Sequence, residues 1–205
     1  METVDSSLLS FISSTFQRGS VFFAEDLEPS GFSPDVIRWS LTRLVRDQTG
    51  VVRLARGVYC VPFHHEGSGK LLMPSAGIVA EALARRWRVR IAPVGAQAAY
   101  YAGFTSLQTH QNTFVSDGSD QVFHLQNGME IRFVRRLSLK VFSFRSEVMR
   151  NLSEGMRYLG KEYFDQSEGR GVVSMNLQKV DDEEFLHDIR LCPSWIREIM
   201  KECRV

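Results

Sequence analysis

A capped helix followed by a tight hairpin is the segment that most constrains how this chain can fold. Ser33 can cap the helix, and Pro34 suits its first position because proline has a fixed φ and lacks an N–H. Two short β-rich runs follow, at residues 51–54 and 58–61, and Ala55, Arg56 and Gly57 join them. We therefore expect one well-marked helix packed beside a two-stranded hairpin.

This helix is predicted to be amphipathic, and Gly50 ends its periodic pattern. Its buried stripe consists of Ile37, Leu41, Leu44 and Val45. The opposite face carries polar and aromatic residues, namely Arg38, Trp39, Thr42, Arg43 and Arg46. A helix with this division packs one side on a core and presents the other side to a partner or to water.

The residues before the capped helix complete a recognisable order of elements. Apolar residues at helical spacing predict a first helix over 5–16. A short strand stub is predicted at 21–23, followed by a brief helix at 24–28. Helix, stub, helix, turn, capped helix and hairpin is the order of a winged helix-turn-helix. We predict such a DNA-binding domain over residues 1–63.

A polar segment at 64–70 contains Gly67, Ser68 and Gly69 and is interpreted as a linker. A second domain is expected over 70–205. Its predicted helices span 75–87, 95–102, 147–161, 181–189 and 193–203. Its predicted strands span 88–92, 113–116, 121–125, 129–134 and 140–144, with a hairpin turn at Asn127 and Gly128. The predicted fold class is α+β, with a largely antiparallel sheet in this second domain.

Composition limits the compartment and the partners. The chain has 205 residues and a formal net charge of +1, so any basic surface must be local. Its three cysteines are widely spaced, which favours reduced thiols. The N-terminal stretch carries Glu2 and Asp5 where a secretory signal is basic, and no apolar run is long enough to span a bilayer. We expect a cytoplasmic protein without a membrane partner.

Positive charge gathers on the capped helix and its hairpin. Between residues 38 and 56 there are five arginines and one acid, Asp47, which gives a local net charge of +4. The predicted DNA-binding residues are Arg38, Thr42, Arg43, Arg46, Arg53 and Arg56. The alternative is a solvated helix face on a winged helix that binds a protein.

A second group of arginines could extend a DNA footprint or contact RNA. It consists of Arg85, Arg86, Arg88 and Arg90. Alternating arginines on the open face of a strand are also typical of a solvated sheet face, which is the favoured interpretation. The arginine-rich run from 132 to 145 allows the same two interpretations.

Motifs for catalysis or metal binding are weak in this sequence. The run 67–70 lacks the first glycine and the Ser or Thr of a phosphate loop. His64, His65 and Glu66 have no partner at ligand spacing, and His110 and His124 are isolated. Cys60 lies in a predicted strand, where a buried, inert thiol is expected. We expect no catalytic residue, no metal and no cofactor.

Several segments resemble AbiEi-type antitoxins of bacterial type IV toxin–antitoxin systems. In the first domain these are LTRLV at 41–45 and VRLARGVYCVP at 52–62. In the second domain they are APVGAQAAYYAGF at 92–104, VSDG at 115–118, IRF at 131–133 and PSWI at 193–196. The motifs occur in the order that the family shows, and they span most of the chain.

The resemblance implies a bacterial transcriptional autorepressor that binds double-stranded promoter DNA, with a homodimer on the DNA as one possibility. It also implies an antitoxin, not an enzyme, that counteracts a nucleotidyltransferase-like toxin, with or without contacting it. One alternative is a plain transcription regulator whose second domain binds a ligand or mediates dimerisation. Another is a nuclease-associated or nucleotide-modifying enzyme, which the scarcity of clustered acids and histidines disfavours.

Overall fold

The computed structural model describes residues 4–64, 67, 71–107, 111–165 and 167–204. The protein has a mixed α+β fold with antiparallel and mixed sheets, as the sequence predicts at this level. Two compact units divide the chain. The first comprises Met1–Arg86 and His124–Met129, and the second comprises Trp87–Phe123 and Glu130–Val205.

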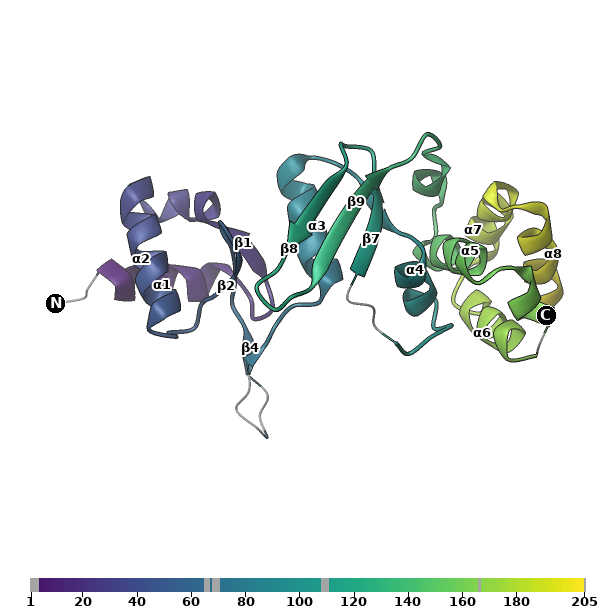
Figure 1. The fold of residues 1–205 in the computed structure, drawn as a ribbon, viewed down its shortest axis with the longest axis horizontal. Coiled ribbons are helices and arrows are strands. Elements are labelled where there is room, and N and C mark those ends of the chain that lie inside the picture. Colours follow the sequence, from purple (N-terminus) through teal and green to yellow (C-terminus); the bar gives the residue numbers. More distant parts are fainter. Residues whose placement is uncertain (1–3, 65–66, 68–70, 108–110, 166, 205) are drawn as a thin grey trace. The chain divides into compact units, whose positions relative to one another are not determined.

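The first unit is built from helices and short strands (Figure 1). In chain order they are α1 (Val4–Thr15), β1 (Val21–Phe23), the 3-10 helix η1 (Ala24–Ser30), α2 (Pro34–Arg46), β2 (Val52–Ala55), β3 (Val58–Cys60), β4 (Phe63–His64), β5 (Leu71–Leu72) and α3 (Ala76–Trp87). Strands β1, β3 and β2 form an antiparallel sheet in that order.

The predicted start of α2 is confirmed. The Ser33 hydroxyl accepts a hydrogen bond from the N–H of Val36, and Pro34 is the first helical residue. The hairpin that follows turns at Gly57, whose φ of 77° lies in the left-handed region that glycine adopts without strain. Local sequence chemistry therefore sets both the beginning of α2 and the turn between β2 and β3.

One apolar core holds the first unit together. It joins α1, η1, α2 and the sheet through buried side chains that include Leu8, Leu27, Ile37, Leu41 and Tyr59. The ring of Phe22 stacks between those of Phe16 and Tyr59, at centroid distances of 4.8 and 5.8 Å. The stripe that periodicity predicts on α2 thus faces this core and leaves the other face of the helix exposed.

The predicted linker at 64–70 lies mostly outside the described residues. Its described edges pair, because β4 and β5 form an antiparallel ladder in which His64 opposes Leu71. Arg86 of α3 makes a bidentate ion pair with Glu25, at 2.7 and 2.9 Å, and its guanidinium lies 4.4 Å from the ring centroid of Phe23. These contacts join α3 to the first unit, and the predicted division at residues 63 and 70 stays a prediction.

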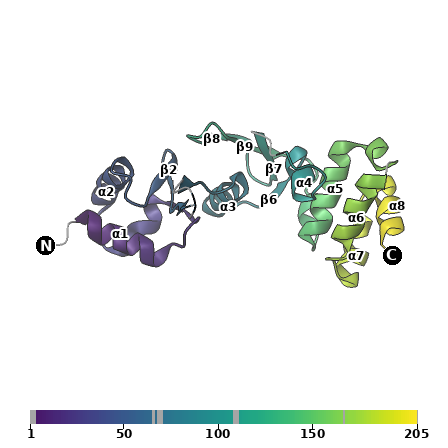
Figure 2. The same ribbon diagram turned by 90° about the horizontal axis from the view of Figure 1, so that it is seen from below.

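The second unit combines a sheet with helices. Its elements are β6 (Ile91–Pro93), α4 (Ala96–Tyr101), β7 (Gln111–Ser116), β8 (Gln121–His124), β9 (Glu130–Arg135), η2 (Lys140–Ser143), α5 (Glu147–Leu159), η3 (Lys161–Asp165), α6 (Ser167–Leu177), α7 (Asp182–Asp188), η4 (Ile189–Leu191) and α8 (Ser194–Cys203). Figure 2 shows α4 beside α5, with α6 next to α5 and α8 on the far side of α6; α7 also contacts α5.

The sheet of the second unit is more mixed than predicted. Its order is β6-β7-β9-β8, with β6 and β7 antiparallel but β7 and β9 parallel. After β7 the chain passes to the edge position of β8, and the turn at Asn127–Gly128 then returns β9 beside β7. Sequence alternation predicts that strands exist but does not say which of them become neighbours, so it missed the parallel pair.

Three local predictions in the second unit differ from the structure. The strand expected at 140–144 is the 3-10 helix η2, because the N–H of Phe142 bonds to the carbonyl of Leu139 within the segment. The strand expected at 88–92 begins only at Ile91, since Arg88 has a φ of 56°. Helix α6 was not predicted, because two internal glycines lower its helix propensity.

The helices of the second unit pack closely at one crossing. Ala98, Ala99 and Ala102 are buried, as expected of a short helix rich in small residues. A Cβ added to Gly155 of α5 would lie 3.0 Å from the Cα of Ala99. The absence of a side chain at Gly155 therefore allows the backbones of α4 and α5 to approach.

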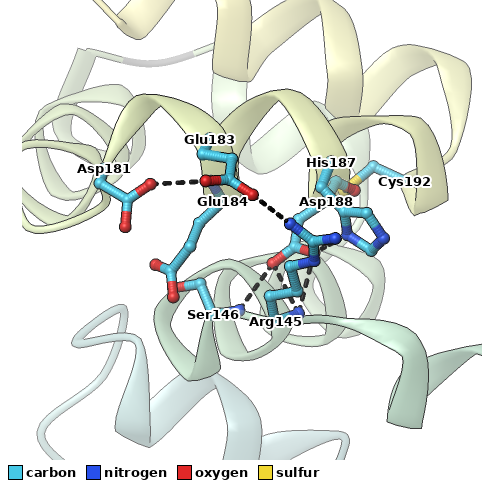
Figure 3. Close-up of polar contacts among 8 residues, drawn as sticks. All are labelled: Arg145, Ser146, Asp181, Glu183, Glu184, His187, Asp188 and Cys192. Carbon is cyan, nitrogen blue, oxygen red and sulfur yellow. Dashed lines mark hydrogen bonds and ion pairs between the residues drawn. The ribbon is translucent and has the colours of Figure 1, made fainter.

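A buried carboxylate ties α7 to the start of α5 (Figure 3). Asp188 is fully buried and accepts hydrogen bonds from the backbone N–H groups of Arg145, at 2.9 and 3.1 Å, and Ser146, at 2.8 Å. The Arg145 side chain also pairs with Glu183 at 2.7 Å. Asp188 thus accepts from the backbone donors at the N-cap of α5 and at the residue before it.

Candidate nucleic-acid interface

The exposed face of α2 is the strongest candidate site in the first unit. Arg38, Trp39, Thr42 and Arg46 are all exposed, and their spacing places them along one side of the helix. The structure therefore brings together three of the residues that the sequence predicts to bind DNA, namely Arg38, Thr42 and Arg46. We call these four residues the α2 face.

Trp39 is the residue of the α2 face that the prediction of DNA-binding residues left out. Trp39 is 71% exposed, which is unusual because its large side chain is mostly apolar and tryptophan is on average well buried. Helical spacing already placed it with Arg38 and Thr42 on the polar side. That position, together with its residue type, is the signal that could have identified it as a contact residue.

The two arginines of the α2 face have exposed acidic neighbours. Arg38 pairs with Asp35 at 3.0 Å, and Arg46 pairs with Asp47 at 2.8 Å. The hydrogen bond from Arg46 lowers the pKa of Asp47. Exposed pairs of this kind contribute little stability, so either guanidinium can exchange its carboxylate for a phosphate at small cost.

Arg43 occupies a different environment. It reaches α1, where it pairs with Asp5 at 2.8 Å, and both side chains are partly buried. Arg43 therefore joins α2 to α1 through this ion pair, and it is not part of the α2 face. Thr42, by contrast, is exposed, and its hydroxyl donates to the carbonyl of Arg38 at 2.8 Å.

The hairpin carries the other two predicted contacts. Arg56 is exposed at the turn, and no described residue pairs with its side chain. Arg53 is partly buried on β2, and its Nε donates to the carbonyl of Ala55 at 3.3 Å. Arg56 is thus the more available of the two for a phosphate.

Acids from outside the basic segment reduce its local charge. The sequence window from 38 to 56 has a net charge of +4, but two acids from outside it, Asp5 and Asp35, pair with Arg43 and Arg38. The remaining positive charge is modest. Any nucleic-acid contact must depend on where these arginines point as well as on their number.

The second predicted group of arginines is divided between the units. Arg85 and Arg86 belong to the first unit, whereas Arg88 and Arg90 belong to the second. Arg86 is engaged by Glu25, as described above, and Arg90 donates to Asp117 at 2.8 Å and stacks on Phe142. Arg85 and Arg88 are exposed, and no described residue pairs with either of their side chains.

Most arginines in the run 132–145 are also paired. Arg132 contacts Glu130, Arg136 contacts Glu154, and Arg145 contacts Glu183. Asp120 accepts a hydrogen bond from the backbone N–H of Arg135. The arginines of this run therefore make separate ion pairs in the second unit.

The cysteines occupy apolar surroundings that suppress thiol chemistry. Burial raises the pKa of Cys60 to about 12, and burial is also the main cause that raises the pKa of Cys192 to about 11. Both thiols stay protonated at neutral pH, and the Sγ of Cys192 donates to the backbone carbonyl of Asp188 at 3.6 Å. A thiolate nucleophile is therefore not formed at either position.

Metal and membrane features can be assessed for the described residues. Within these residues, no group of three or more His, Cys, Asp or Glu is arranged to hold a metal ion. His65, Glu66 and His110 lie outside the described part of the chain. No described helix combines the length and the apolar character that crossing a membrane requires.

Fold and site together define an α+β protein that exposes an arginine-bearing helix beside a hairpin. The chain belongs to a family of unknown function (DUF6088), whose model matches residues 9–185. A solved structure, that of the RV2827C protein from Mycobacterium tuberculosis, is similar with 14% identity and a TM-score of 0.48, over 99% of this chain and 76% of that one. The comparison with curated proteins gave no match.

Proposed function

We propose that the first unit is a winged helix-turn-helix that binds double-stranded promoter DNA. Its order of elements supports this proposal, since α1, β1, η1 and α2 precede the β2–β3 hairpin. In this arrangement α2 is the recognition helix and the hairpin is the wing.

The α2 face carries the proposal. The major groove of DNA admits one α-helix, whose polar side chains read base edges while cations hold phosphates. Arg38 and Arg46 supply the cations, Thr42 supplies a hydroxyl, and Trp39 supplies an exposed aromatic surface. Arg56 at the hairpin turn is placed to contact the backbone beside the groove.

At the level of the whole chain, we propose a transcriptional autorepressor and antitoxin of a type IV toxin–antitoxin system. The AbiEi resemblance of the segments at 41–62 and 92–133 supports this proposal. The protein would act in the cytoplasm without catalysis of its own and counteract a nucleotidyltransferase-like toxin. A plain transcription regulator whose second unit binds a ligand or mediates dimerisation is the alternative.

Promoter binding tests the first part of the proposal. Fluorescence anisotropy with a labelled duplex from upstream of the protein's own coding sequence should show affinity about a thousandfold higher than for a shuffled duplex of equal composition. Both should weaken as salt rises, because phosphate contacts release counterions. Equal affinity for the two duplexes at every salt concentration would contradict sequence-specific repression.

Growth rescue separates the antitoxin from the plain regulator. The gene adjacent to that of this protein is expressed from an inducible promoter. In one strain this protein is co-expressed from a second, foreign promoter, and in the other strain it is absent. If the neighbouring gene encodes a nucleotidyltransferase-like toxin, its expression alone should stop growth. Co-expression of this protein should then restore growth. A neighbour that is harmless, or toxicity that a folded, expressed protein leaves unchanged, argues for the plain regulator.

A further inference from the structure

A pocket in the second unit has the composition of a small-molecule site. It has a volume of about 390 Å³ and lies between strands of the sheet and helices α4 and α5. The residues that give it chemical character are Gly95, Gln97, Thr113, Arg136 and Tyr158. Its volume falls in the range of about 300 to 1,000 Å³ that ligand pockets occupy in proteins.

Gln97 is the residue in the pocket that most needs an explanation. Only 3% of it is exposed, and its carboxamide has no hydrogen-bond partner among the residues that the structure describes. Its amide atoms are not among the fully buried, unpartnered polar atoms of the described residues, so water or a ligand in the pocket can reach them. A carboxamide that lines a pocket without a protein partner is therefore available to a ligand.

Arg136 supplies positive charge to the same pocket. Its Nη1 donates to the buried carboxylate of Glu154 at 2.8 Å, and Arg157 lies 3.9 Å from the other oxygen of that carboxylate. The two arginines thus outweigh the one acid by a single positive charge. The ion pair orients the Arg136 guanidinium, whose other N–H groups have no partner among the described residues.

Tyr158 gives the pocket an aromatic wall. The ring is 57% exposed and passes over Gly95, where an added Cβ would lie 3.7 Å from the Cδ2 of Tyr158. Gly95 has a φ of 61°, a conformation that favours glycine. The Tyr158 ring and the backbone of Gly95 therefore form adjacent parts of the pocket wall.

We propose that this pocket binds a nucleotide, with the base against Gln97 and Tyr158 and the phosphate at Arg136. A Gln carboxamide can donate to and accept from the edge of adenine at the same time. Aromatic rings provide stacking surfaces for bases, and a guanidinium can pair with a phosphate in bidentate fashion. An adenine nucleotide, free or at the end of an RNA strand, satisfies all three side chains.

This inference goes beyond the proposed DNA binding and does not depend on it. The residues that form the pocket all belong to the second unit, whereas the α2 face belongs to the first. Variants in the pocket should therefore alter nucleotide binding without altering the affinity of α2 for a promoter duplex. Failure of one proposal leaves the other open to its own test.

Isothermal titration calorimetry of the full chain with AMP tests the proposal directly. AMP should bind, and adenosine and inorganic phosphate should each bind at least tenfold more weakly, because each lacks part of the set of contacts. A short RNA ending in adenosine 3′-phosphate distinguishes the two sources, since tighter binding than AMP indicates a strand end. Absence of binding by both AMP and the RNA would overturn the proposal.

Variants of Gln97 and Tyr158 provide the sharper test. Gln97→Met should weaken AMP binding at least tenfold and leave the melting temperature of the unliganded protein unchanged, because the amide has no described protein partner to lose. Tyr158→Ala should weaken binding about tenfold, and Tyr158→Phe should restore it because the ring is kept. AMP affinity unchanged in Gln97→Met, or a lower melting temperature without ligand, would show that Gln97 has a structural role.

Discussion

At the scale of single residues, the second unit depends on one buried acid. Asp188 accepts all its backbone hydrogen bonds from the segment that leads into α5, 42 and 43 residues earlier in the chain. No local pattern marks such a partner. The contact is created by folding, and its loss would leave two backbone donors without an acceptor.

Replacing Asp188 should therefore be costly. Asp188→Ala should lower the free energy of unfolding by about 3 kcal/mol, since unsatisfied donors cost roughly 1 to 3 kcal/mol each. Urea denaturation of the full chain measures the change. Asp182→Ala is the control, because the Asp182 side chain is 91% exposed and its ion pair among the described residues is with Arg204. An equal effect of both substitutions would contradict the role given to Asp188.

The candidate site shows what residue patterns predict and what they miss. Helical spacing placed Arg38, Thr42 and Arg46 on one face, and the structure has them there. Helical spacing could not show that Arg43 differs from the exposed residues of the α2 face, because its partner Asp5 lies 38 residues earlier in the chain. Charge counted along the sequence likewise omits acids that folding brings near.

At the scale of elements, the structure assigns opposite roles to two helical glycines. Gly155 lies where α5 meets α4, and an added Cβ would crowd the backbone of Ala99 at 3.0 and 3.2 Å. Gly171 lies within α6, and an added Cβ there meets nothing within 4 Å. One glycine permits packing, whereas the other only weakens a helix.

Alanine substitutions at these glycines should shift stability in opposite directions. Gly171→Ala should stabilise the protein by about 0.5 to 1 kcal/mol through helix propensity. Gly155→Ala should destabilise it by about 1 to 2 kcal/mol, because overpacking outweighs that gain. Thermal and urea unfolding measure both. Stabilisation by Gly155→Ala would mean that α4 and α5 can separate without cost.

Elements with local signals were predictable, and elements without them were not. The start of α2 was predicted because Ser33 and Pro34 act within one turn. Helix α6 was missed because its glycines resemble a loop, although its buried Val173 and Leu177 join the core. The parallel pairing of β7 and β9 depends on chain routing between distant strands, which periodicity does not contain.

At the scale of the whole molecule, the two units have separate cores and separate candidate sites. The α2 face, for which we propose DNA binding, belongs to the first unit, and the pocket around Gln97, for which we propose nucleotide binding, belongs to the second. Such a division is compatible with the autorepressor and antitoxin proposal and with its plain-regulator alternative. The claim common to both is that α2 contacts promoter DNA.

That claim is tested most directly by the double variant Arg38→Gln/Arg46→Gln. Both side chains are exposed, so the variant should fold normally. Anisotropy with the promoter duplex should show at least hundredfold weaker binding and a salt slope lower by about two units, one per lost phosphate contact. Arg190→Gln, at an exposed arginine of η4, is the matched control and should bind as wild type does. Wild-type affinity and slope in the double variant would contradict the account.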